Sequence, residues 1–283
     1  MSVLSTLIHP MPVDEFRADV FERAPLHFRD AHVEPLFGHA ELDALVAATS
    51  EICPHRLRLN RDGAVLVPPR GARPRDLQRW VWENYAEGAT IIINYIDAID
   101  LKSGRFARGL GAELGARVSL TVFATPAGSR GFAPHFDTLD VFVVQLSGHK
   151  AWSLGQSAVS LPTLRQGALV SYAGERPVID FQLSLGPGDV LYIPRGVVHW
   201  AAAADGPTLH VTADVGTATF GDLVDAAARK SLKDSGTRLA HMREANDGAP
   251  IDIRALLDPL RSVDGICDLC DEIIEQKWDR KTS

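Results

Sequence analysis

The chain has 283 residues, enough for one large domain or for one domain with an appendage. Hydrophobic residues make up 46% and charged residues 23%, as in an ordinary soluble globular enzyme. The net charge of -7 argues against a general nucleic-acid-binding protein, because such proteins are usually basic.

Other features of the sequence indicate a cytoplasmic protein. The segment 1–16 lacks the apolar core and basic flank of a secretory signal, and no stretch approaches the roughly 20 apolar residues of a membrane span. Three cysteines, Cys53, Cys267 and Cys270, do not make a disulfide framework. A reducing cytoplasm is therefore the expected compartment, without membrane or direct nucleic-acid partners.

The first third of the chain is expected to be mostly helical. Between its helices, the alternation of Arg56–Val67 predicts a hairpin that turns at Asp62-Gly63. The run Gly109–Gly115 superficially resembles a nucleotide loop, but its last glycine is one residue late and no buried strand precedes it. We interpret this run as a helix end and a turn. The predicted helices are Val13–Arg23, before the break at Pro25, and Glu41–Ala48 and Leu77–Tyr85.

The middle of the chain changes to short strands separated by glycine and proline. This pattern predicts a sandwich or barrel rather than a parallel α/β sheet. The turn Ser147-Gly148 is expected to join two of the strands in a two-residue hairpin that sets Lys150 opposite Gln145. The predicted strands are Val118–Phe123, Val141–Leu146, His149–Leu154, Ala168–Tyr172, Val178–Leu183, Val190–Ile193 and Thr208–Val215.

The pattern returns to helix after Gly216, at Phe220–Lys233, Asp252–Leu260 and Asp264–Trp278. The sequence therefore predicts a main domain over residues 1–222 and a short helical appendage over 223–283, which we expect to support a homodimer. Cys267 and Cys270 would share one face of a helix, and we interpret them as a structural pair.

Two histidines and one aspartate form a candidate metal site. His135 and Asp137 are two residues apart, so on an extended segment both side chains project from the same face, while His199 must arrive from another strand. Each of the three lies where a strand meets a proline-containing turn. Such a set can hold Fe(II) and leave coordination positions open, although three mixed ligands could also suit zinc.

The residues around this site resemble a known family. Gly128–Asp137 and Asp140–Trp152, followed by Gly188–His199, are similar to the JmjC-type ribosomal oxygenases, which are cupin-fold hydroxylases dependent on Fe(II) and 2-oxoglutarate. Phe21–His27 also resembles the N-terminal segment of that family, so the resemblance covers roughly residues 12–225. It implies a mainly β (α+β) fold, a double-stranded β-helix (cupin/JmjC jelly-roll barrel) with a helical N-terminal segment and a short helical C-terminal appendage.

The resemblance also implies roles for single residues. His135, Asp137 and His199 would be the catalytic iron ligands, Lys150 would pair with the distal carboxylate of 2-oxoglutarate, and Thr121 would assist it. A straight strand of ten residues spans roughly 33 Å, too far for one small dicarboxylate to bridge. A bend is therefore expected between Thr138 and Asp140.

Two positions near this site call for separate interpretation. Phe123 stands where some relatives have a tyrosine, so one hydroxyl donor would be missing from the co-substrate site. His210 lies on a late strand and could approach the pocket, but we interpret it as a packing residue.

The resulting hypothesis is an oxygenase that uses Fe(II), 2-oxoglutarate and O2 to hydroxylate a C–H bond of a protein or peptide side chain. A free amino acid or small natural-product metabolite is an alternative substrate. Two further alternatives are a metal-binding cupin without redox chemistry, acting as a ligand sensor or binding module, and a zinc cupin isomerase. Because unrelated activities share one fold, the substrate needs separate support.

Overall fold

The computed structural model describes residues 2–34, 36–156, 159–162, 178–203 and 205–231. The chain divides into two compact units, residues 1–215 and 216–283. The described residues contain no helix that is both long and apolar enough to cross a membrane. The predicted strand 168–172, the predicted helices 252–260 and 264–278, and Cys267 and Cys270 lie outside the described residues.

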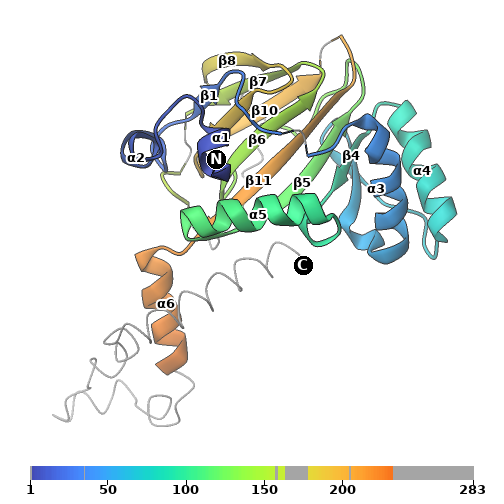
Figure 1. Ribbon diagram of the computed structural model, residues 1–283. Coiled ribbons are helices and arrows are strands. Elements are labelled where there is room, and N and C mark those ends of the chain that lie inside the picture. Colours follow the sequence, from blue (N-terminus) through green and yellow to red (C-terminus); the bar gives the residue numbers. More distant parts are fainter. Residues whose placement is uncertain (1, 35, 157–158, 163–177, 204, 232–283) are drawn as a thin grey trace. The chain divides into compact units, whose positions relative to one another are not determined.

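Two sheets form the frame of the first unit (Figure 1). The larger sheet has the order β1-β9-β6-β11-β5-β4-β2-β3, and the smaller has the order β10-β7-β8. From β5 to β11 the chain passes back and forth between the sheets, as a double-stranded β-helix requires. The strands are β1 Leu26–Phe28, β2 Leu57–Arg61, β3 Ala64–Leu66, β4 Thr90–Ile93, β5 Ala116–Thr125, β6 Asp140–Ser147, β7 Lys150–Gly155, β8 Ile179–Leu185, β9 Val190–Ile193, β10 Val198–Ala203 and β11 Thr208–Thr217.

Helices pack against the larger sheet and at its end (Figure 1). In the helix Leu101–Leu114, the Asp100 side chain accepts a hydrogen bond from the Ser103 amide at the start, and Gly115 ends the helix with φ of 59°. The helices are α1 Val3–Leu7, α2 Val13–Glu15, α3 His39–Ile52, α4 Pro74–Ala86 and α5 Leu101–Leu114, with α6 Phe220–Ser231 in the second unit; a π-helical turn covers Phe16–Val20, and 3-10 turns cover Pro54–Arg56 and Ile96–Ala98.

The alternation of residues along β5 separates two environments. Leu120, Val122 and Ala124 are fully buried in the main hydrophobic core, together with residues of the helices. Their neighbours Thr121, Phe123 and Thr125 project from the opposite face, because successive side chains of a strand alternate. A second core lies between the sheets and includes Val141, Val143, Trp152, Leu154, Leu185, Leu191 and Ile193. The polar face of β5 is therefore directed toward the interior between the sheets.

Several predictions for the first half are confirmed. The hairpin of β2 and β3 turns at Asp62 and Gly63, whose φ angles of 51° and 87° suit a tight two-residue turn. Gly109–Gly115 is the end of α5 and its capping turn. The predicted helix Val13–Arg23 is helical only to Val20, because Glu22 adopts a left-handed conformation with φ of 57°. The short strands β1, β4 and β10 were not predicted.

The predicted hairpin at Ser147-Gly148 is wrong. β6 pairs with β9 and β11 in the larger sheet, whereas β7 pairs with β8 and β10 in the smaller sheet. Gln145 faces His210 of β11, and Lys150 faces Leu185 and Ala203. The turn at Gly148 (φ 67°) therefore carries the chain from one sheet to the other, so Lys150 belongs to the sheet that also holds His199.

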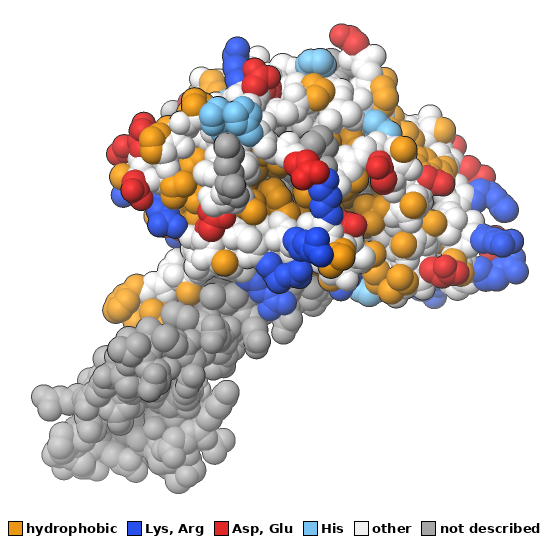
Figure 2. Space-filling view, in the orientation of Figure 1, with side chains coloured by type: hydrophobic (Ala, Val, Ile, Leu, Met, Phe, Trp, Pro, Cys, Tyr) orange, Lys and Arg blue, Asp and Glu red, His pale blue; other side chains and the backbone are white. Residues whose placement is uncertain are grey.

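The surface of the described part mixes both signs of charge. In Figure 2, acidic and basic side chains are interspersed over the visible face, with hydrophobic side chains between them. This distribution is typical of a globular protein surface.

Candidate metal centre

The backbone brings His135 and His199 together. His135 lies in the segment between β5 and β6, and His199 is the second residue of β10. The two residues form an isolated antiparallel bridge in which each amide donates to the carbonyl of the other, at 3.2 Å and 2.7 Å. The Asp137 carbonyl accepts from the Gly196 amide at 2.9 Å, which ties the third residue to the turn before β10.

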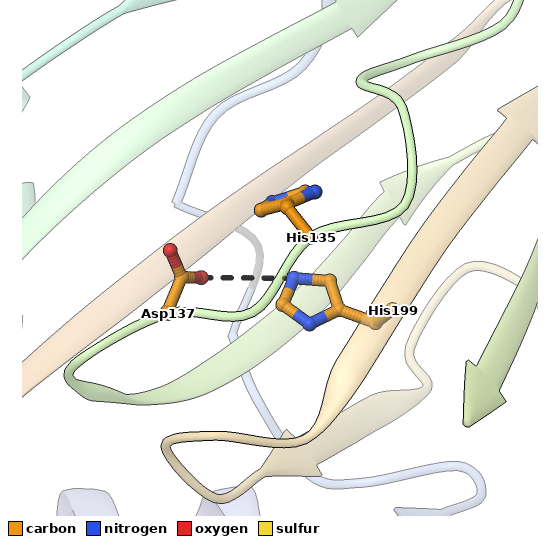
Figure 3. Close-up of side chains that lie close together, drawn as sticks. All are labelled: His135, Asp137 and His199. Atoms are coloured by element: carbon orange, nitrogen blue, oxygen red, sulfur yellow. Dashed lines mark ion pairs between the residues drawn. The ribbon is translucent and has the colours of Figure 1, made fainter. Parts of the chain in front are cut away.

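The three predicted ligands converge on one point. One potential ligand atom from each of His135, Asp137 and His199 lies within 4.8 Å of the other two, and Nε2 of His199 is 3.6 Å from Oδ2 of Asp137. Figure 3 shows the three side chains directed toward one another, His199 from β10 and the other two from the segment between β5 and β6. Atoms that share an ion at about 2.1 Å lie within about 4 Å of one another, so small rotations suffice to bind a metal.

Both imidazoles are oriented for coordination through Nε2. Nδ1 of His135 lies 2.8 Å from the Ala133 carbonyl, and Nδ1 of His199 lies 3.0 Å from the Val197 carbonyl. Because a carbonyl only accepts, each Nδ1 carries the proton and each Nε2 offers its lone pair. The same contact to the residue two positions earlier therefore fixes the tautomer of both histidines.

The electrostatics of His199 keep it neutral. Burial, and then the nearby His135, lower the pKa of His199 to about 4, although Asp137 acts in the opposite direction. At neutral pH its lone pair is therefore free of a competing proton. A neutral imidazole is the form in which histidine binds metals.

Lys150 is a buried cation beside this centre. Only 2% of Lys150 is exposed, and its Nζ donates to Oγ1 of Thr125 at 2.9 Å. Thr125 in turn accepts from the Thr90 hydroxyl at 3.2 Å. Burial lowers the pKa of Lys150 from 10.5 to about 7, and within the described part of the chain no carboxylate pairs with it. A lysine in this state is suited to receive the carboxylate of a ligand.

Thr125, which the sequence did not single out, is the threonine that contacts Lys150. Thr121 is buried on the same face of β5, but the hydroxyl that accepts from Lys150 belongs to Thr125. The predicted strand ended at Phe123, whereas β5 continues to Thr125, directly before Pro126. Residues 121 and 125 are four positions apart and so lie on the same face of the strand, and this spacing could have pointed to Thr125. The role of Thr121 in co-substrate binding stays a prediction.

Ring contacts connect His210 to both histidines of the centre. The ring of Phe123 stacks on His210 with a centroid distance of 4.9 Å and meets Phe132 edge to face at 6.3 Å. Phe132 also contacts His135 edge to face at 5.6 Å, and Trp152 lies 6.1 Å from His199. Phe123 and His210 therefore both border the candidate site.

A buried polar network supports the turn that precedes His199. The Tyr192 hydroxyl donates to Oδ1 of Asp140 at 2.7 Å and accepts from the Glu22 amide at 2.8 Å. The Arg195 guanidinium pairs with Glu22 at 2.9 Å. Burial raises the pKa of Asp140 to about 6, although the hydrogen bond from Tyr192 opposes this shift. The network joins the N-terminal segment to both strands that flank the centre, and the sequence did not predict it.

Between Asp137 and β6 the chain bends as expected. Thr138 and Leu139 form the bend, and β6 begins at Asp140. Because of this bend, Lys150 and the triad are not separated by ten residues of straight strand. Two Nε2 lone pairs and a carboxylate fit a divalent metal, and a buried lysine that has no carboxylate partner among the described residues fits an anionic co-substrate.

Comparisons with known proteins agree with this geometry. Residues 102–223 match the JmjC domain family. Ribosomal oxygenase 1 of Homo sapiens is 32% identical over 232 residues, which cover 78% of this chain and 35% of that protein. The bifunctional lysine-specific demethylase and histidyl-hydroxylase NO66 of Dictyostelium discoideum is 27% identical over 279 residues, covering 92% and 51%. The chain thus spans about a third to a half of the length of these relatives.

A solved structure shows the same fold. The ribosomal oxygenase YcfD from Escherichia coli, in complex with cobalt and 2-oxoglutarate, matches with a TM-score of 0.64 at 16% identity over 94% of this chain and 71% of that one. This likeness confirms the predicted double-stranded β-helix. Residues 102–223 are a JmjC domain, and the chain is similar in sequence to the ribosomal oxygenases.

Proposed function

We propose that the chain is an Fe(II)- and 2-oxoglutarate-dependent oxygenase that hydroxylates a C–H bond of a protein or peptide side chain. The observation that carries the proposal is the convergence of His135, Asp137 and His199, with the buried Lys150 in the same sheet as His199 and without a carboxylate partner among the described residues. A facial set of two histidines and one carboxylate leaves positions open for a co-substrate and O2.

In the proposed reaction each residue has a defined task. His135, Asp137 and His199 would hold Fe(II). When bound, the iron would couple hydroxylation of the substrate to the conversion of 2-oxoglutarate and O2 to succinate and CO2, with one oxygen atom going to the substrate and one to succinate. Lys150, with Thr125 beside it and Thr121 on the same strand face, would hold the distal carboxylate of 2-oxoglutarate. Phe123, Phe132 and Trp152 would exclude water from this space.

The names of the relatives support a protein substrate. The matched proteins include ribosomal oxygenases and bifunctional enzymes whose names state lysine-specific demethylase and histidyl-hydroxylase activities. Both activities act on side chains of proteins. We infer the same class of substrate here, with ribosomal proteins as the first to test.

The experiment follows turnover and product together. The protein is reconstituted anaerobically with Fe(II) and then given 2-oxoglutarate, O2 and a set of ribosomal-protein peptides. Succinate is measured, and mass spectrometry seeks a peptide that has gained one oxygen. We expect His135→Ala and Asp137→Ala to abolish succinate release and His149→Ala, an exposed histidine beside Lys150, to retain it. Activity on free amino acids but on no peptide would indicate a small-molecule hydroxylase, and ligand binding without any succinate would indicate a non-redox cupin.

We further propose a cytoplasmic homodimer, as the sequence predicts. Its support is the cysteine usage and the charged helical pattern after Gly216. Cell fractionation tests the compartment, and light scattering of the full chain tests the dimer.

A further inference from the structure

His210 is a buried histidine, and one nitrogen of its ring lacks a hydrogen-bond partner among the described residues. It lies on β11 just after an irregularity in the register with β6, and only 3% of it is exposed. Its Nδ1 has no hydrogen-bond partner among the residues that the structure describes. A buried polar atom without a partner is unfavourable, so such atoms in a folded protein usually meet a water, an ion or a ligand.

The environment of His210 indicates an anionic ligand. The ammonium of Lys150 is close enough to act, after burial, as the second cause that lowers the pKa of His210. Trp152 meets the ring edge to face at 5.7 Å, and its own Nε1 is also buried without a described partner. Lys150 and two ring nitrogens without described partners therefore lie near one another, which is the arrangement that stabilises a carboxylate.

Phe123 explains why an imidazole is needed at this place. Its ring lies parallel to that of His210, with a centroid distance of 4.9 Å and an interplanar angle of 6°. Phe123 brings no donor, whereas some relatives carry a tyrosine at the corresponding position. The ring that lacks the hydroxyl is therefore the one that packs against the ring of His210.

We propose that His210 is a co-substrate-binding residue whose Nδ1–H donates to the distal carboxylate of 2-oxoglutarate beside Lys150, in place of the hydroxyl that Phe123 lacks. This inference rests on the proposed function, since it assumes that 2-oxoglutarate occupies the site. It replaces the interpretation of His210 as a packing residue with a role in recognition.

The test measures binding without turnover. The full chain is loaded with Mn(II) under anaerobic conditions, and 2-oxoglutarate is titrated by calorimetry. 2-Oxobutanoate serves as the matched ligand, because it has the metal-chelating 2-oxo acid group but no distal carboxylate. The variant His210→Phe keeps an aromatic ring against Phe123 and removes the donor.

We expect His210→Phe to raise the Kd for 2-oxoglutarate about tenfold, equivalent to about 1.4 kcal/mol, and to leave the Kd for 2-oxobutanoate unchanged. The double variant Phe123→Tyr/His210→Phe should recover affinity for 2-oxoglutarate, because it restores a hydroxyl donor. An unchanged Kd for 2-oxoglutarate in His210→Phe, or an equal loss for both ligands, overturns the inference.

A second pair of variants guards against misfolding. His210→Asn and His210→Leu are similar in size, but only asparagine retains an N–H donor. If asparagine binds 2-oxoglutarate no better than leucine, the inference is overturned. The proposed function fails separately, if the wild-type protein does not bind 2-oxoglutarate at all or if Lys150→Met binds it as well as the wild type.

Discussion

Lys150 shows how one residue can link stability to ligand recognition. An ammonium enclosed with a single described partner, the Thr125 hydroxyl, is poorly solvated, and this lowers its pKa to about 7. The unliganded protein carries this cost in its folded state. A ligand carboxylate would offset this cost, so part of the affinity would come from giving the buried amine a charged partner.

The first prediction concerns the pH dependence of stability. Between about pH 7 and pH 10.5 the unfolded chain binds the Lys150 proton and the folded chain does not, so the free energy of unfolding rises with pH in this window. Lys150→Met removes this titration. In urea unfolding of the metal-free protein, we expect the variant to be more stable than the wild type at pH 7, on the order of a few kcal/mol, with a smaller difference near the upper end of the window.

Lys102→Met is the control for this prediction. Lys102 is exposed and pairs with Glu34 at the surface, so Lys102→Met controls for the loss of a lysine that is not buried. If Lys150→Met and Lys102→Met show the same pH dependence of stability, Lys150 does not titrate as the structure indicates.

At the residue scale, sequence patterns located the triad but not all of its surroundings. The motif around His135 and the apolar strand before His199 are local signals, and the structure brings these side chains together. Thr125 and the Tyr192–Asp140 pair depend on contacts between strands that are distant in the sequence. Spacing within one segment contains no information about such contacts.

The turn between β6 and β7 is the decisive element for the position of Lys150. At Gly148 the chain leaves the larger sheet and enters the smaller one, with φ of 67° and the Pro207 carbonyl in the space that a Cβ would occupy. A two-residue hairpin fits the same sequence, and the alternation of β6 and β7 does not distinguish the two arrangements. The prediction of a hairpin failed because the choice is made by pairing with β8, β10 and β11.

Two glycines with the same backbone conformation separate strain from steric overlap. Gly128→Ala should cost about 1–2 kcal/mol of unfolding free energy for its positive φ alone, because nothing lies within 4 Å of the added Cβ. Gly148→Ala should cost more, about 2–4 kcal/mol, because overlap with Pro207 adds to the same strain. Chemical denaturation of both variants measures the difference, and equal losses would mean that the crossover tolerates a side chain.

The network before β10 gives a second prediction at this scale. Tyr192→Phe leaves Oδ1 of Asp140 with only the Arg195 amide as a donor, at 3.4 Å, and removes the acceptor of the Glu22 amide, so we expect a loss of about 1–3 kcal/mol in unfolding free energy. Tyr85→Phe on α4 is the matched control and should change stability by less than about 0.5 kcal/mol, since its hydroxyl has no hydrogen bond to another described residue. Equal effects of the two substitutions would contradict a supporting role for the network.

At the scale of the whole molecule, the first unit contains the structure that the candidate site requires. Both hydrophobic cores of this unit are built from residues up to Val215, and the triad and Lys150 lie within the same range. The sequence predicted the mainly β class because several short strands have clear boundaries. It gave the domain boundary as residue 222, and that boundary stays a prediction.

A truncation after Thr217 tests this division. We expect the fragment to unfold cooperatively and to bind Mn(II) as the full chain does, because its cores and ligands are retained. Light scattering should give a dimer for the full chain and a monomer for the fragment. Loss of cooperative unfolding would show that the first unit depends on the rest of the chain, and a dimeric fragment would locate the dimer contact elsewhere.

The bridge between His135 and His199 has a consequence for how such a centre can change. Its two N–H···O bonds use only main-chain atoms, so they do not depend on which side chains stand at these positions. A substitution at either residue changes the ligand atom that an ion meets, but the two residues still lie opposite each other in the bridge. The main chain thus fixes the positions of the two ligands, whereas the side chains decide which ion they bind. A single substitution can therefore change the metal preference while the backbone stays the same.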